Sequence, residues 1–100
     1  MIARGTTPTI KYTFTEVNVT DITIAYLTVH QGSISIEHDL EDATVGDGYL
    51  EWTLSQEETL ALSTKTFARI QCRYKTSDGN AYITKITEEK VYDILKEGEI

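Results

Sequence analysis

The sequence contains two histidines, whose side chains could bind a metal ion. We expect His30 at the tip of a β-hairpin and His38 just beyond the second strand of that hairpin, opposite Ala25. A zinc site needs three or four ligands that converge on one point, and these two rings are then too far apart to share an ion. The sequence therefore predicts two surface histidines and no zinc site.

Four carboxylates crowd the segment 38–48, namely Asp39, Glu41, Asp42 and Asp47. Calcium takes six to eight oxygen ligands, so a cluster of this kind could contribute to a cation site. The spacing lacks the Asp-x-Asp-x-Asp-Gly order of a dedicated calcium loop. We therefore expect a solvated acidic loop and no metal.

Cys72 is the only cysteine, which excludes an internal disulfide. A catalytic thiol needs an exposed, electropositive environment and a general base, whereas the strand pattern points Cys72 inward. No Ser-His-Asp set and no Gly-rich phosphate-binding loop accompanies it. We expect no enzymatic activity, no cofactor and no small-molecule substrate.

The length and the net charge of the chain limit its number of domains and the kinds of partner that it can bind. The chain has 100 residues, enough for one domain over 1–100. Nine basic against sixteen acidic residues give a net charge of −7, which disfavours nucleic acid and anionic membranes as partners. No apolar run approaches the roughly 20 residues of a membrane span, and no export signal is evident at the start. We expect the protein to be made in the cytoplasm.

Alternation of apolar side chains predicts β-strands that are buried on one face. Three such sets are Ile10, Tyr12 and Phe14; Ala25, Leu27 and Val29; and Leu50, Trp52 and Leu54. A turn at Gln31-Gly32 would pair Val29 with Ile34 and Leu27 with Ile36, apolar on apolar. Trp52 is predicted to lie in the core.

A second hairpin follows from Ser77-Asp78-Gly79, which suits a three-residue loop closed by a left-handed glycine. That loop pairs Tyr74 with Tyr82, Cys72 with Thr84 and Ile70 with Ile86. A two-residue loop would place Cys72 opposite Lys85, so the three-residue loop is favoured.

One short helix at about 56–62 interrupts the strands. Ser55 and Glu58 form a capping-box pattern, with Ser55 as the N-cap. Short strands at this spacing predict an all-β, immunoglobulin-like antiparallel sandwich. The segment 91–95 is ambiguous: we interpret it as continuing the last strand past a bulge, although Val91, Ile94 and Leu95 also fit a helical turn.

One strand carries apolar residues on the face that should meet water. Opposite Ala25, Leu27 and Val29 the same strand presents Ile22, Ile24 and Tyr26. A solvated sheet face is usually polar, so a contiguous apolar row indicates a protein-binding patch. The alternative is that another segment, such as the N-terminal one, covers these side chains.

Four stretches carry a resemblance to a known group of proteins. They are Arg4–Ile10, Asp21–Leu27, Leu50–Thr59 and Arg73–Gly79. Together the chain resembles small proteins encoded in the tail and baseplate regions of phages and prophages of Gram-positive bacteria, and it is similar to the N-terminal domain of baseplate upper proteins. The matching motifs are structural, and no functional residue transfers with them.

The resemblance implies a structural or adaptor protein of a virion, made in the bacterial host, that binds other phage structural proteins or itself. The chain lacks the long C-terminal extension of baseplate upper proteins, so attachment of a receptor-binding protein does not follow. The alternative is a carbohydrate-binding module, since sandwich folds often host these. Tyr49, Tyr82 and Tyr92 would then be the candidate sugar-stacking side chains.

Overall fold

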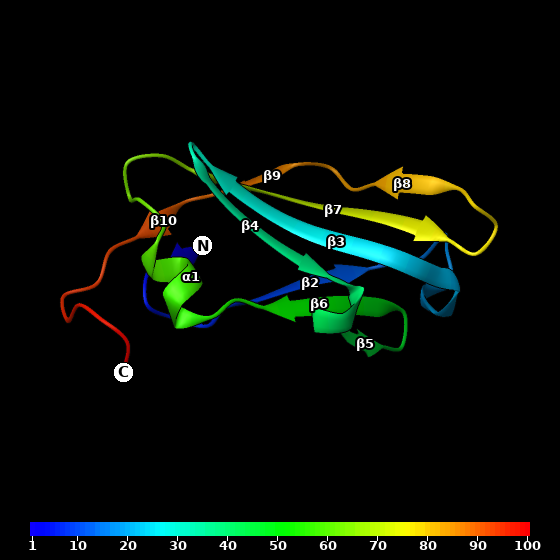
Figure 1. The fold of residues 1–100 in the computed structure, drawn as a ribbon, viewed down its shortest axis with the longest axis horizontal. Helices are drawn as coiled ribbons and strands as arrows, with labels where there is room; N and C mark the ends of the chain where they lie inside the picture. Colours follow the sequence, from blue (N-terminus) through cyan, green and yellow to red (C-terminus); the bar gives the residue numbers. More distant parts are fainter.

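Two antiparallel sheets face each other across one core in a computed structural model, which describes residues 1–100 (Figure 1). The larger sheet has the order β4–β3–β7–β8, with β9 also paired to β7. Its strands are β3 (Ile22–Gln31), β4 (Ile34–Asp39), β7 (Ala68–Thr76), β8 (Ala81–Ile83) and β9 (Thr87–Glu89). The smaller sheet has the order β2–β6–β5, from β2 (Thr9–Thr13), β5 (Thr44–Gly46) and β6 (Tyr49–Thr53). The predicted all-β sandwich is confirmed, and its immunoglobulin-like assignment stays a prediction.

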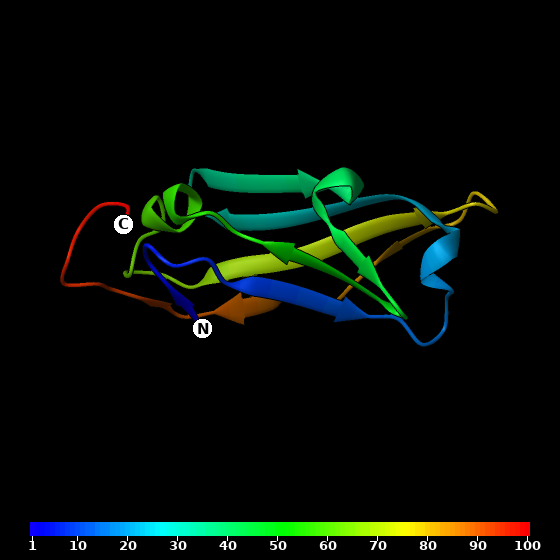
Figure 2. The same ribbon diagram turned by 90° about the horizontal axis from the view of Figure 1, so that it is seen from below.

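The molecule is elongated, with extents of 47 × 25 × 19 Å. Figure 2 shows the smaller sheet lying across the larger one, with the C-terminal segment at one end and the β7–β8 hairpin at the other. Three short helices complete the chain: η1 (Val19–Asp21), η2 (Leu40–Asp42) and α1 (Gln56–Leu60).

The core follows the alternation of the strands. Leu27, Leu50 and Leu54 are fully buried, and Trp52 is 1 % exposed. The indole Nε1 of Trp52 donates a hydrogen bond of 2.9 Å to the backbone oxygen of Asp39, so the ring is fixed against the larger sheet. Burial of such side chains removes apolar surface from water and is the main force that holds the two sheets together.

The first hairpin has a different register from the predicted one. Its loop is Gly32-Ser33, so Gln31 pairs with Ile34 and Val29 with Ile36. Leu27 pairs with His38, and the expected pairing of His38 with Ala25 is therefore wrong. The shift is two residues, which keeps the same side chains inward because successive side chains alternate between faces.

The second hairpin has the predicted three-residue loop. Tyr74 pairs with Tyr82, the backbone N–H of Thr84 donates to the oxygen of Cys72 at 2.9 Å, and Gly79 has φ of 89°. Farther along, Ile70 pairs with Thr87 instead of Ile86. One extra residue between β8 and β9 shifts the pairing, and the predicted Ile70–Ile86 pair is wrong because Ile86 turns outward and is 41 % exposed.

The capping box of α1 is confirmed. The backbone N–H of Ser55 donates to Oε1 of Glu58 at 2.8 Å, and the N–H of Glu58 donates to Oγ of Ser55 at 3.1 Å. The helix ends at Leu60, earlier than the predicted 62, and Leu62 beyond it is buried.

Residues 91–95 form no helix. Val91 and Tyr92 make β10 (Val91–Tyr92), which pairs in parallel with β1 (Ile2–Ala3). Backbone N–H groups of Ile2 and Arg4 donate to the oxygens of Lys90 and Tyr92, each at 3.0 Å. The extended interpretation is confirmed for Val91 and Tyr92 alone, since residues 93–95 lie outside any strand. The prediction that the segment continues the last strand of the hairpin is wrong, because β10 pairs with β1 in a separate parallel sheet.

Candidate protein-binding face

The side of the larger sheet that faces away from the core has two exposed apolar side chains near its centre. Ile24 is 44 % and Tyr26 42 % exposed, and both belong to β3, an interior strand between β4 and β7. The N-terminal strands do not cover them, because β2 lies in the smaller sheet and β1 pairs with β10. These two predicted residues are therefore available to a partner.

The prediction that Ile22 shares this face is wrong. Ile22 is 6 % exposed and belongs to the hydrophobic core. The pairing of β3 with β7 shifts between Ile22 and Ile24, where Thr23 is the extra residue of a bulge. A bulge reverses the alternation on one side of it, so Ile22 points inward while Ile24 points outward.

Charged residues flank the two apolar side chains on both sides. On β7, Arg73 is paired with Tyr26 and Lys75 with Ile24. On β4, Asp39 is paired with Tyr26 and Glu37 with Thr28. We call this surface the outer face; it consists of Ile24 and Tyr26, the basic row Arg69, Arg73 and Lys75, and the acidic row Glu37, Asp39 and Glu41.

Shallow hollows lie on either side of the apolar pair. Ile24 and Tyr26 line one with Arg73 and Lys75, of about 180 Å³. They line a second, also of about 180 Å³, with Asp39 and Glu41 among others. The surface beside these side chains can therefore receive the side chains of a partner.

The charges of the outer face are unpaired within the chain. The ion pairs of the protein join other groups: Met1 to Glu89, Arg4 to Asp93 and Glu97, and His38 to Asp42 and Glu58. Arg73 and Asp39 lie on opposite sides of Tyr26, two strand spacings apart, which is roughly 10 Å. That separation is too long for an ion pair, so neither charge neutralises the other. Oδ1 of Asp39 accepts a hydrogen bond of 3.3 Å from the backbone N–H of Asp42.

His38 forms a cluster that the sequence did not reveal. Its Nδ1 lies 3.0 Å from Oδ2 of Asp42 and its Nε2 lies 2.7 Å from Oε2 of Glu58. The side chain is 21 % exposed, so the prediction of a simple surface histidine is wrong for His38. Nothing in the sequence brings β4 next to α1, and no local signal could have found this contact.

The charge of His38 follows from these partners. Burial of the ring opposes the charged form, but hydrogen bonds and negative charge from Asp42 and Glu58 outweigh burial, so the pKa of His38 is raised. The hydrogen bond from His38 in turn lowers the pKa of Asp42. A protonated imidazole donates from both nitrogens, which makes this a structural tie between β4, η2 and α1.

Two carboxylates of the acidic segment contact the backbone of η2. Asp39 and Asp42 satisfy the backbone of η2 in a capping box, and no group of three or more His, Cys, Asp or Glu side chains has an arrangement that could hold a metal ion. His30 is exposed and does not join His38.

Cys72 lies in the core as predicted, with no exposed surface. Burial raises the pKa of its thiol to about 12, so the group is protonated at neutral pH. A protonated, inaccessible thiol cannot act as a nucleophile.

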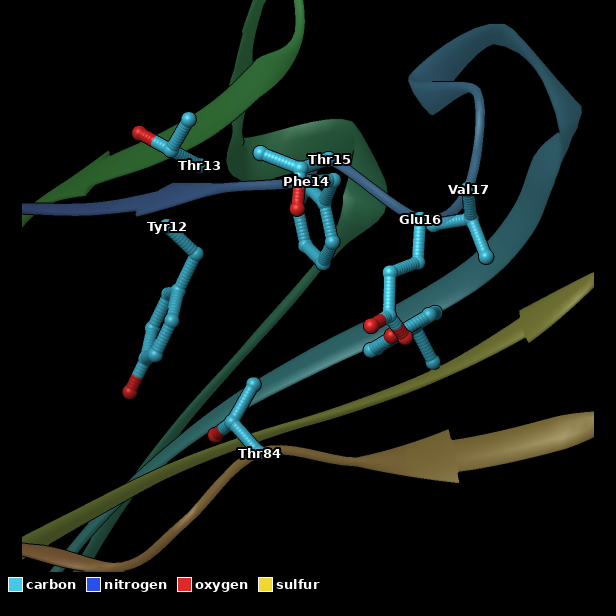
Figure 3. A pocket seen from close by; sticks show the side chains of 8 residues that line it. Tyr12, Thr13, Phe14, Thr15, Glu16, Val17 and Thr84 are labelled. Atoms are coloured by element: carbon cyan, nitrogen blue, oxygen red, sulfur yellow. The ribbon is translucent and has the colours of Figure 1, made fainter.

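A further hollow of about 190 Å³ lies between the edges of the two sheets (Figure 3). Tyr12 extends from β2 toward Thr84, which follows β8, and Phe14 and Glu16 also line the hollow. Phe14 packs edge-on against Tyr74, with ring centroids 4.9 Å apart. Burial raises the pKa of Tyr12 and of Tyr74. Phe14 and Tyr74 contact each other, whereas Tyr12 packs edge-on against Trp52 of the core.

The three candidate sugar-stacking tyrosines lie on different strands, and each has a neighbour on its ring. The Nζ of Lys11 is 4.1 Å from the ring centroid of Tyr49, and that of Lys90 is 5.2 Å from the ring of Tyr92. Tyr82 stacks on Tyr74 with centroids 5.2 Å apart. They do not form a shared platform.

No protein-family model matches the chain, and neither a curated protein nor a solved structure shows significant similarity to it. None of the helices combines the length and the apolar composition needed to cross a membrane.

Proposed function

We propose that this protein is a non-catalytic structural or adaptor component of a phage or prophage virion, and that it acts in tail or baseplate assembly through protein contacts on the outer face. Support comes from the resemblance in strand starts, capped helix and hairpin turn, and from the surface chemistry of the sheet. Its partners in this proposal are other virion proteins, including further copies of the chain.

The observation that carries the proposal is the exposure of Ile24 and Tyr26 between two unpaired charged rows. An apolar centre with a charged rim is typical of protein interfaces, and a tyrosine at the centre of such a patch often contributes much of the binding energy. Both side chains stand on an interior strand whose backbone is hydrogen-bonded on each side, so the patch is held in a fixed geometry.

Mass spectrometry of purified particles tests the proposal. We expect the protein in particles released by the strain that carries the gene, in constant ratio to tail proteins. A gene deletion complemented with Tyr26→Asp should yield particles that lack the protein. Tyr92→Asp is the matched control, because Tyr92 is equally exposed, at 43 %, but lies on β10. Absence of the wild-type protein from particles, or normal incorporation of Tyr26→Asp, would overturn the proposal.

A further inference from the structure

We infer that the outer face binds a second copy of the chain, face to face, around a two-fold axis that runs along β3. The inference rests on the proposed function in that it names a partner for the same surface. The observation behind it is the arrangement of charge across β4, β3 and β7.

At the levels of Tyr26 and Ile24 the outer face has one sign of charge on one side and the opposite sign on the other. Only one side is charged at Thr28, between Glu37 and Gln71, and at His30, between Ser35 and Arg69. At Tyr26 the neighbours are Asp39 on β4 and Arg73 on β7. At Ile24 they are Lys75 on β7 and, across the hollow beside Ile24, Glu41 in η2. The apolar side chains thus lie on the line that separates an acidic row from a basic row.

This arrangement is complementary to itself in one orientation. Rotation by 180° about an axis along β3 brings the acidic row of one copy over the basic row of the other, at the same level along the strands. Lys75 then faces Glu41 of the second copy, Arg73 faces Asp39, and each contact occurs twice, as symmetry requires. Rotation about an axis across the strands would instead bring like charges together.

The apolar residues support the same orientation. An axis along β3 brings the Tyr26 side chains of both copies to the centre of the interface, with those of Ile24 next to them. Sheets that pack face to face keep their strands within about 30° of each other, which an axis along β3 allows.

The size of the face sets the expected strength. β3, with ten residues, is roughly 33 Å long, and the three strands of the outer face are together roughly 15 Å wide, so each copy contributes at most roughly 500 Å². The total of roughly 1,000 Å² is below the roughly 1,200 Å² at which stable specific interfaces begin and is in the range of weak, transient ones. We therefore expect a weak, reversible dimer whose population rises with protein concentration and decreases as salt screens the charged rows.

Charge reversal tests the orientation. Lys75→Glu and Glu41→Lys alone should each raise the dimer dissociation constant at least tenfold in sedimentation equilibrium, because each places two like-charged pairs in the interface. The double variant should regain wild-type association. An equimolar mixture of the two single variants should also associate, since both pairs of the mixed dimer are then opposite in sign.

Exposed residues outside the outer face provide matched controls. Lys65→Glu and Glu16→Lys change the net charge by the same amounts and should leave association unchanged. A wild-type chain that stays monomeric up to millimolar concentration would overturn the inference, as would single variants that dimerise normally or a mixture that fails to associate. If the chain is monomeric but Tyr26→Asp still blocks its entry into particles, the inference fails and the proposed function stands.

Discussion

Glu58 binds two separate parts of the molecule at once, through Oε1 to the N-cap of its own helix and through Oε2 to Nε2 of His38 at 2.7 Å. The second contact joins an edge strand of the larger sheet to the helix that follows the smaller one. It adds one protonation-dependent contact to the attachment of α1, beside the hydrogen bonds from Thr59 to the oxygen of Thr6 and from Arg4 to the oxygen of Leu60.

We expect the stability of the protein to depend on pH through His38. The folded pKa of His38 is raised, so its stabilisation is complete below the unfolded value of about 6.5 and is lost as pH rises through the folded pKa. The pKa of Asp42 is lowered, so the stabilisation from its carboxylate is present above the ordinary carboxylate pKa and is lost as the pH falls through the folded pKa. The largest joint contribution lies at roughly pH 4 to 6.5.

Urea unfolding from pH 5 to 9 measures this effect. His38→Gln should be clearly less stable than wild type at pH 6 and differ less as the pH rises. His30→Gln is the control, because His30 is exposed and forms no ion pair. A His38→Gln difference that stays constant across the range would contradict the prediction.

Gln31→Ala should lower the free energy of unfolding by about 2 kcal/mol, because loss of the buried side-chain amide leaves the backbone groups that it binds without hydrogen-bond partners. Nε2 of Gln31 donates to the backbone oxygens of Ser63 and Thr66 at 2.7 and 2.9 Å, and its Oε1 accepts from the N–H of Ser63 at 2.7 Å. Limited proteolysis should show faster cleavage within 61–67. Gln71→Ala is the control, because it removes one hydrogen bond to Thr84, and it should lower the free energy of unfolding by less than half as much. Equal losses in the two variants would contradict the prediction that Gln31 holds the segment 61–67 in place.

Gly46→Ala should destabilise the protein by about 1–3 kcal/mol, the usual range for overpacking. A Cβ at position 46 would lie 1.9 Å from Cζ of Tyr49, whose ring covers this glycine. The cost should nearly vanish in a Tyr49→Ala background, since the two positions are coupled by contact. Thermal unfolding of the wild type, the two single variants and the double variant measures the coupling. Additive changes in the free energy of unfolding would contradict the prediction.

The thiol of Cys72 should not react with a disulfide reagent at pH 8 while the chain is folded. Its pKa is raised to about 12 and it has no exposed surface. In denaturant one thiol per chain should react within minutes. Rapid labelling of the folded protein, at a rate independent of denaturant, would show that the strand carrying Cys72 is not packed as described.

Local features of the sequence were sufficient for much of the fold. The capping box at Ser55 and the loop closed by Gly79 are determined by residues within a few positions of each other, and both predictions are confirmed. Burial of Trp52 followed from alternation alone. Alternation could not fix the first hairpin, because turns at Gln31-Gly32 and Gly32-Ser33 both leave the same side chains facing inward. The observed turn places Val29 opposite Ile36 but Leu27 opposite His38.

Bulges and long-range contacts account for what the sequence could not reveal. The extra residue at Thr23 turns Ile22 inward, and a bulge has no sequence signature strong enough to predict one here. The ring of His38 meets Glu58 only because the sandwich brings an edge strand and a helix together. Two of the three residues predicted for the binding patch, Ile24 and Tyr26, remain on it because they lie beyond the bulge.

The parallel pairing of β1 with β10 has a mechanical consequence. In a parallel pair, the chain enters one strand and leaves the other at opposite ends, so tension between Met1 and Ile100 pulls the two strands past each other. Both hydrogen bonds of the pair, and the Arg4 contacts with Asp93 and Glu97, then bear the load together instead of breaking one after another. Force applied along the chain therefore loads this pair in shear.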